Sequence, residues 1–384
     1  MLRDQIKVLF PRIHTLWRFL KGFVIAAFVR RKITFDSEFT DYVLWCKYGE
    51  DQLKSLYKTG NSHRNPLRLN IIATQKIRPS VLPEYYHYNP TLQLENGMIR
   101  VFWRVSTFSY VDYFDHLGMY NSFNLDALQN FERIATGLLR SASDSDFGIV
   151  TDENVLPEVE IINKVEVAKA IGWEGAKVYV EDPRAHEGTG RYITAIARFG
   201  KIEKNLSRML LIDLATYNGI IIPTLDPSMT EKNWVVIHEL EDSLLFLTQS
   251  KPLIIEKVNI KTGVSERVTI QENESQLSSK NVNGGSPFVR IDSKHFIRVA
   301  RLQFGIYGVG TCRISVLVLH DLEFKEVARS KPFVFNKLGV EICNGLMIKD
   351  DLVYFSWGVD DLEMYVGRCS KAELMGWFNE NLQN

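Results

Sequence analysis

From Tyr85 onward the chain is a succession of short apolar runs separated by turn-forming residues, and this pattern limits the possible folds more than any other feature. Runs such as 98–104, 191–198 and 295–301 are rich in β-branched and aromatic residues, and few long helical patterns interrupt them. Short strands at such spacing are typical of an all-β sandwich, barrel or propeller.

The β-rich runs group into five units of unequal length, each of which places a polar or glycine-rich segment beside an apolar strand. If the units are blades around an axis, their polar ends gather at one mouth of the central channel. We therefore expect an all-β fold: a five-bladed β-propeller over residues 85–370, preceded by a basic, mostly α-helical extension (1–84) and followed by a short carboxy-terminal helix (371–384). A two-sheet sandwich with polar turns is the alternative, because the units are not close copies of one another.

The second unit contains a charged segment that ends a strand-like run. Pro183 cannot donate to a central β ladder and biases the preceding residue to extended geometry, so we expect Asp182 at a strand end or bulge, where its side chain reaches a cleft. Arg184 is expected to point the same way, two residues further on. A turn closed by a solvated Asp–Arg pair is the alternative. The glycine-rich residues after His186 predict that this histidine lies in an exposed turn.

A resemblance to a known family rests on five segments in order: Asn89-Pro90, Glu181-Asp182-Pro183-Arg184, Glu231-Lys232-Asn233-Trp234, Gly284-Gly285-Ser286-Pro287 and Trp357-Gly358-Val359-Asp360-Asp361. Together they resemble the five-bladed β-propeller enzymes of glycoside hydrolase family 130, the mannoside phosphorylases, and the related β-mannosyltransferases. The resemblance covers roughly residues 85–369 and leaves 1–84 unmatched.

The resemblance implies roles for individual residues. Asp182 matches the catalytic aspartate that exchanges a proton with the glycosidic oxygen, and Asp361 matches an aspartate that holds hydroxyls of the reacting sugar. Arg104 and Arg184 match polar positions at the inner ends of the first two blades, and Lys232 matches a basic residue near the phosphate site. The family carries a phosphate-binding histidine in the fourth blade, where this chain has Arg298 or Arg301.

The chemistry of glycosidic bonds assigns these residue types independently. A reaction at such a bond needs a group that moves a proton and a surface that stabilises charge on the other side of the anomeric carbon. Asp182 suits the first task, and Lys232 and Arg301 suit phosphate oxygens. Asn89 and the ring of Trp234 are candidates for sugar binding, although we favour the blade core for the tryptophan.

Charge and cysteine content exclude several other classes. The chain has 46 basic and 46 acidic side chains, a balance that argues against nucleic acid as a partner. Its four cysteines show no metal-type spacing, so we expect free thiols in the cytoplasm, no metal and no cofactor.

The first 32 residues depart from this balance. They hold eight Lys or Arg against one Asp, around an apolar run that is too short to span a bilayer. The pattern predicts either a basic amphipathic helix lying on an anionic membrane, on the inner face, or a helix packed on the body of the protein.

Three functions remain open, and the first is favoured. It is an inverting glycosyltransferase that uses a nucleotide-activated sugar, GDP-mannose by the resemblance, to extend a glycan acceptor in surface polysaccharide or glycoconjugate synthesis, with Asp182 as base. The second is a β-mannoside phosphorylase or glycoside hydrolase, which handles sugar phosphate or water with Asp182 as acid. The third is a propeller that binds glycans without catalysis. The basic segment 1–32 favours the transferase, because such enzymes act on lipid-linked acceptors.

Overall fold

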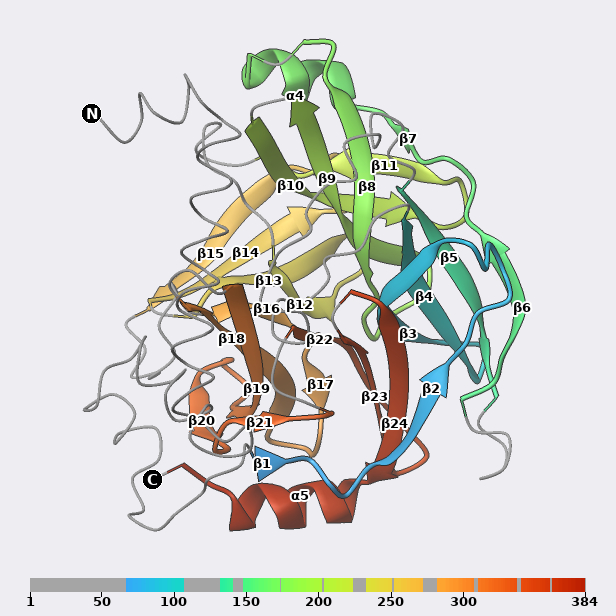
Figure 1. Ribbon diagram of the computed structural model, residues 1–384. Coiled ribbons are helices and arrows are strands. Elements are labelled where there is room, and N and C mark those ends of the chain that lie inside the picture. Colours follow the sequence, from blue (N-terminus) through green and yellow to red (C-terminus); the bar gives the residue numbers. More distant parts are fainter. Residues whose placement is uncertain are drawn as a thin grey trace, which may run out of the picture.

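The computed structural model describes residues 67–106, 132–140, 148–172, 174–201, 204–223, 233–250, 252–271, 282–306, 310–336, 340–359 and 361–383. Over these ranges the chain is all-β, with a propeller-like arrangement of sheets and only two helices, α4 (Lys164–Ala170) and α5 (Lys371–Glu380) (Figure 1). The described strands form five separate sheets, so the two-sheet sandwich is excluded.

Three of the sheets have four strands each. One contains β3 (Tyr86–Glu95), β4 (Met98–Ser106), β5 (Glu132–Leu139) and β6 (Val150–Val155). Another contains β12 (Val235–Glu239), β13 (Ser243–Gln249), β14 (Leu253–Asn259) and β15 (Ser265–Gln271). The last contains β22 (Glu341–Lys349), β23 (Leu352–Val359), β24 (Glu363–Ser370) and, from the other end of the chain, β2 (Ala73–Ile77).

The other two sheets are larger. The five-stranded sheet is an antiparallel meander of β8 (Lys177–Arg184), β9 (Tyr192–Lys201), β10 (Lys204–Asp213) and β11 (Asn218–Ile221), with β7 (Glu160–Ile161) parallel at its edge. The seven-stranded sheet contains β16 (Val282–Gly285), β17 (Val289–Arg290), β18 (Phe296–Ile306), β19 (Gly310–His320), β20 (Glu326–Arg329), β21 (Phe333–Val334) and β1 (Leu67–Arg68). In the described residues, the three four-stranded sheets and the β8–β11 meander give four regular four-stranded blades rather than five. The seven-stranded sheet is irregular, because β18 pairs with two short strands, β16 and β17, and β19 pairs with two others, β20 and β21.

Clusters of buried apolar side chains join each sheet to two neighbours. The β3–β6 sheet packs against the β8–β11 sheet through Phe102 and Ile193, and the latter packs against the β12–β15 sheet through Tyr192 and Trp234. Phe288 of the β16–β21 sheet completes the next cluster, with side chains of β12–β14. The sheets therefore follow one another in chain order around a common centre (Figure 1).

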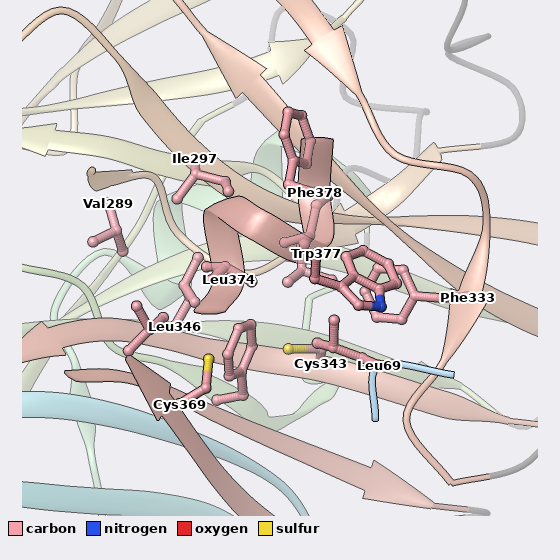
Figure 2. Close-up of a cluster of buried hydrophobic side chains, with 14 of the residues drawn as sticks. Leu69, Val289, Ile297, Phe333, Cys343, Leu346, Cys369, Leu374, Trp377 and Phe378 are labelled. Carbon is pink, nitrogen blue, oxygen red and sulfur yellow. The ribbon is translucent and has the colours of Figure 1, made fainter. Parts of the chain in front are cut away.

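Two further clusters continue this order. One joins the sheet of β22–β24 to the β3–β6 sheet, and the other joins it to the β16–β21 sheet. Figure 2 shows the second cluster, in which Leu374, Trp377 and Phe378 of α5 pack beside Phe333. Helix α5 begins at a capping box, in which Ser370 and Glu373 satisfy each other's backbone N–H groups.

Strands from both ends of the described chain share one sheet. Strand β2 pairs antiparallel with β24, so the outer strand of the last sheet comes from the amino-terminal side. β1 pairs with β21 of the neighbouring sheet. The sheet system thus begins before residue 85, where we had expected it to start, because these two short strands carry little periodicity of their own.

The basic segment 1–32 and the rest of residues 1–66 lie outside the described residues, so the expected amino-terminal helix stays a prediction. Among the helices of the described ranges, none is long and apolar enough to cross a membrane.

Each sheet contains one strand, among β3, β8, β12, β16 and β22, that is interrupted by a bulge. The register shifts fall between Tyr88 and Thr91 in β3 and between Glu181 and Arg184 in β8, and each of these shifts contains a proline. Strands β12, β16 and β22 are interrupted in the same way. A proline has no N–H for the ladder, so the sequence itself forces the first two bulges.

Candidate functional site

The bulges of β3 and β8 bring two polar side chains together. Asn89 and Asp182 each precede the proline of their bulge, and the Asn89 Nδ2 atom donates to the Asp182 Oδ1 atom at 2.6 Å. Thr91 fixes this geometry: its hydroxyl donates to the carbonyl of Asn344 in β22 and accepts from the backbone N–H of Ala185. The three strands are therefore tied to one another at the level of the bulges.

Four polar residues in this region share an unusual backbone conformation. The φ angles are 55° at Asn89, 49° at Asp182, 74° at Asn233 and 51° at Asp361. Asn and Asp enter this left-handed region more readily than other side chains that carry a Cβ, and it costs free energy even for them. Residues held in such conformations cluster at functional sites, which makes this set a candidate site.

Asp182 lies in a network of buried charges. Arg104 Nη1 is 3.4 Å from Asp182 Oδ1, and Arg104 Nη2 is 2.7 Å from Glu181 Oε2. Arg198 approaches Glu181 at 3.7 Å. The Asp182 side chain is 20% exposed, against 4% for Arg104 and 7% for Glu181. Asp182 is thus the carboxylate of this network that a ligand can reach, and Glu181 is paired inside.

A second network joins three sheets through one neutral oxygen. The Asn233 Oδ1 atom accepts from Arg184 Nη2 at 2.8 Å and from Arg301 Nη2 at 3.3 Å. Arg184 Nη1 also donates to the carbonyl of Trp234 at 3.1 Å. The Nε atoms of Arg184 and Arg301 are buried without a hydrogen-bond partner. Two cations are therefore held in the interior by an amide that carries no charge.

The surroundings keep these two arginines poorly compensated. Burial lowers the pKa of Arg184, and the charge of Asp182 opposes that shift. Burial, followed by the charges of Arg313 and Arg184, holds the pKa of Arg301 well below its ordinary value, while Asp182 and Asp361 act in the opposite direction. The shifts follow from the cost of desolvating a cation and from repulsion between like charges.

Gly284 explains how Asn233 and Arg184 can approach so closely. A Cβ atom at Gly284 would lie 3.0 Å from both Arg184 Nη1 and Asn233 Cβ, and the φ angle of 68° also disfavours a side chain there. The absence of a side chain at Gly284 therefore leaves room for the second network.

Asp361 and Tyr88 complete the site. Asp361 follows strand β23 and is 6% exposed. The Tyr88 hydroxyl donates to Ser106 Oγ at 3.2 Å, and the Arg104 guanidinium lies 4.9 Å from the centre of its ring. Burial raises the pKa of Tyr88 well above its usual value, with the charge of Arg104 opposing the shift and those of Asp361 and Asp182 adding to it.

Some residues expected at the site lie elsewhere. Arg298 is in the interface between sheets, where its Nε atom donates to His320 Nε2 at 3.3 Å and its guanidinium lies 5.5 Å from the Phe288 ring centre. The ring of Trp234 packs edge-on against Phe246 in the core. Lys232 lies outside the described residues. Arg298 and the Trp234 ring are therefore not brought to Asp182, whereas the charge of Arg301 is close enough to interact with that of Asp182.

The expectation of an exposed His186 is wrong. The histidine is 2% exposed, and its Nε2 atom lies 3.3 Å from Glu239 Oε2. Glu239 also accepts from the backbone N–H and the hydroxyl of Thr189, so a carboxylate from β12 folds the glycine-rich turn back onto the protein. Sequence around the turn carries no sign of this remote partner.

Four site residues were missed by the sequence argument: Tyr88, Thr91, Glu181 and Asn233. All of them stand inside or directly beside the polar segments, so their position was a usable signal. The partners of Thr91 and Asn233, and Arg104 as a partner of Glu181, could not be foreseen from the sequence, since they come from other sheets. Within the described ranges, no three His, Cys, Asp or Glu side chains gather as metal ligands.

No known protein-family description and no curated protein matches the chain by sequence. Solved structures do match by fold. A mannoside phosphorylase family GH130 structure, from work on glycoside hydrolases that target β-1,2-mannosidic linkages in Candida mannan, is 10% identical and covers 81% of this chain and 92% of its own, with a TM-score of 0.49.

Two phosphorylases match similarly. The β-1,2-mannobiose phosphorylase of Listeria innocua, in complex with β-1,2-mannobiose, is 12% identical and covers 80% of this chain and 94% of its own, with a TM-score of 0.45. A mannose phosphorylase of Leishmania mexicana, in complex with phosphate, is 10% identical and covers 77% of this chain and 87% of its own, with a TM-score of 0.42.

These matches agree with the family resemblance of the sequence, at the level of the fold. The names of the matched structures are those of mannoside phosphorylases and glycoside hydrolases, the alternative function, rather than of transferases that use nucleotide sugars. The expectation of a nucleotide-sugar glycosyltransferase is therefore wrong, and the alternative reading is retained.

Proposed function

We propose that this chain is a phosphorylase of β-mannosides, which transfers a mannosyl group from a glycan to inorganic phosphate. The observation that carries the proposal is the pair of buried arginines, Arg184 and Arg301, that share the neutral Asn233 oxygen beside Asp182. The mannoside part rests on the resemblance of the five polar segments.

The arginine pair argues for an anionic co-substrate. Two desolvated guanidinium groups repel each other, and each keeps a buried Nε donor without a partner. A phosphate ion offers two negative charges and several acceptor oxygens in the geometry that arginine forks match. Lys232, next to Asn233 in the chain, is included in this proposed subsite. A hydrolase that uses water has no need of such a pair.

Asp182 is proposed as the general acid. Its proton passes to the glycosidic oxygen as the bond from that oxygen to the anomeric carbon breaks, while a phosphate oxygen forms a new bond to the same carbon from the opposite side. The products are the shortened glycan and α-mannose 1-phosphate, because a single displacement inverts the configuration. Asp361 is proposed to hold hydroxyls of the mannosyl unit.

The electrostatics of the site couple the two substrates. Arg104 and Arg184 favour the ionised form of Asp182, which cannot act as an acid. A bound phosphate offsets the arginine charge and thereby favours protonation of Asp182. Asp182 can thus act as the general acid when phosphate is bound.

The five sheets are proposed to be the five blades of one closed propeller, including the irregular β16–β21 sheet. The five apolar clusters between neighbouring sheets support this count. Closure leaves fewer free sheet edges than the same strands would expose in an open array.

The test is incubation of the full chain with β-mannobioses, with and without inorganic phosphate, and detection of mannose 1-phosphate. We expect this product only with phosphate, and a decrease of about 10² to 10⁴ in rate for Asp182→Asn with phosphate binding retained. Free mannose formed equally with and without phosphate would make the protein a hydrolase. Sugar binding without any cleavage would leave a binding propeller.

A further inference from the structure

Asn233 accepts hydrogen bonds from two arginines, a position at which a carboxylate is the usual side chain. Its Oδ1 atom lies 2.8 Å from Arg184 Nη2 and 3.3 Å from Arg301 Nη2, which are distances at which Asp would form two ion pairs. Asp would also fit the backbone, because it tolerates the φ angle of 74° as well as Asn does. The amide therefore needs an explanation.

We infer that Asn233 is a positioning residue that holds Arg184 and Arg301 in place without neutralising them, and so sets the affinity of the site for phosphate. The inference rests on the proposed function, since it concerns the phosphate of that reaction. Asn233 comes from the segment before β12, whereas the arginines come from β8 and β18, so one side chain from a third sheet aligns the cations of two others.

The charges around the pair support this role. The charged groups that act on Arg301 are Arg313 and Arg184, which are cations, and Asp182 and Asp361, which are carboxylates. Arg184 feels the charge of Asp182. These two carboxylates offset part of the charge, so the three arginines Arg184, Arg301 and Arg313 exceed them by one positive charge. A third carboxylate at position 233 would complete neutralisation and compete with phosphate for the same donors.

In Asn233→Asp, the stability without phosphate should increase, whereas the affinity for phosphate should decrease. Without phosphate the variant should melt at a higher temperature than the wild type, because a carboxylate now pairs with two buried cations. The KM for phosphate should rise by about tenfold to a hundredfold, as expected when charge-assisted hydrogen bonds worth about 1.5–3 kcal/mol are lost. A residue with a merely structural role would not raise stability and weaken phosphate binding together.

Asn233→Gly separates alignment from charge. Glycine keeps the positive φ angle and removes the acceptor without adding charge. Its KM for phosphate should lie between those of the wild type and Asn233→Asp, and its melting temperature should fall. The matched control is Asn259→Asp, an equal charge change at the last residue of β14, where Oδ1 accepts from backbone N–H groups of the following turn and an Asp can replace it. It should change neither quantity.

The experiment measures thermal unfolding of all four proteins against inorganic phosphate concentration, together with phosphorolysis kinetics. Stabilisation of the wild type by phosphate, its loss in Asn233→Asp and a higher starting melting temperature in that variant are the expected results. Equal phosphate responses of the wild type and Asn233→Asp would overturn the inference and leave the phosphorylase proposal intact. No phosphate response and no mannose 1-phosphate in the wild type would overturn both.

Discussion

Asp182 has a cation on one side and a buried acid next to it in the chain. Arg104 contacts both carboxylates, at 3.4 Å from Asp182 and 2.7 Å from Glu181. The negative charge of Glu181 therefore offsets part of the positive charge of Arg104. The same negative charge disfavours ionisation of Asp182. Both effects oppose the tendency of Arg104 to favour the ionised form of Asp182.

Replacement of Glu181 by Gln should therefore shift the pH dependence of the reaction. The change leaves Arg104 and Arg198 without this carboxylate and favours ionised Asp182, so the alkaline limb of the pH–rate profile should move to lower pH. The variant should also lose stability, by roughly 3–5 kcal/mol, because buried cations lose their partner. The measurement is kcat/KM against pH.

Glu256→Gln is the matched control. Glu256 is buried in β14 and pairs with Arg267 at 3.3 Å, in another sheet. Its replacement should lower stability without moving the pH–rate profile. If Glu181→Gln and Glu256→Gln leave the alkaline limb in the same place, Glu181 does not act on Asp182.

At the scale of elements, the site depends on a strand that carries none of the charges discussed above. Gly358 of β23 faces the bulge of β3: a Cβ atom there would lie 2.9 Å from both the backbone N and the Oδ1 atom of Asn89. The bulge can hold Asn89 against Asp182 only because this position lacks a side chain.

Gly358→Ala should therefore disturb catalysis from a neighbouring strand. The added methyl group must displace Asn89, at a cost of about 1–3 kcal/mol in stability, and a small misplacement of the Asn89–Asp182 pair should lower kcat about tenfold or more. Gly376→Ala in α5 has open space around the new methyl group and should raise stability by up to about 1 kcal/mol. An unchanged kcat in Gly358→Ala would show that Asn89 is not positioned by β23.

The elements also show what sequence can and cannot foresee. The bulge at Asp182-Pro183 was predictable, because the missing N–H of proline is a local property. The partner of Arg184 was not, since its guanidinium bonds to Asn233, 49 positions away in the chain. The same holds for Asn89 and Asp182, which are 93 positions apart and meet only through sheet packing.

At the scale of the whole molecule, β2 joins the beginning of the described chain to its last sheet. Ile77 of this strand is 2% exposed and packs in the cluster between the β22–β24 and β3–β6 sheets. An outer strand that comes from the opposite end of the chain ties the last sheet to the first, so its contacts should stabilise the whole ring rather than one blade.

Ile77→Ala should accordingly lower the stability of the entire protein. We expect a loss of about 2–5 kcal/mol and a single unfolding transition at a lower denaturant concentration, followed by both fluorescence and circular dichroism. Ile270→Ala on β15, also an outer strand but 62% exposed there, should stay within about 0.5 kcal/mol of the wild type. Two separate transitions in Ile77→Ala would mean that β2 stabilises its own sheet alone.

The left-handed backbone at Asn89, Asp182, Asn233 and Asp361 restricts which variants of the site can exist. At such φ angles Gly, Asn and Asp are tolerated and bulkier side chains are penalised. Evolution or a designer can thus exchange an amide for a carboxylate at any of the four positions at little conformational cost. A single exchange of Asn and Asp can therefore change the net charge of the site by one unit while the backbone stays the same. We expect related chains to differ in reaction type through such exchanges.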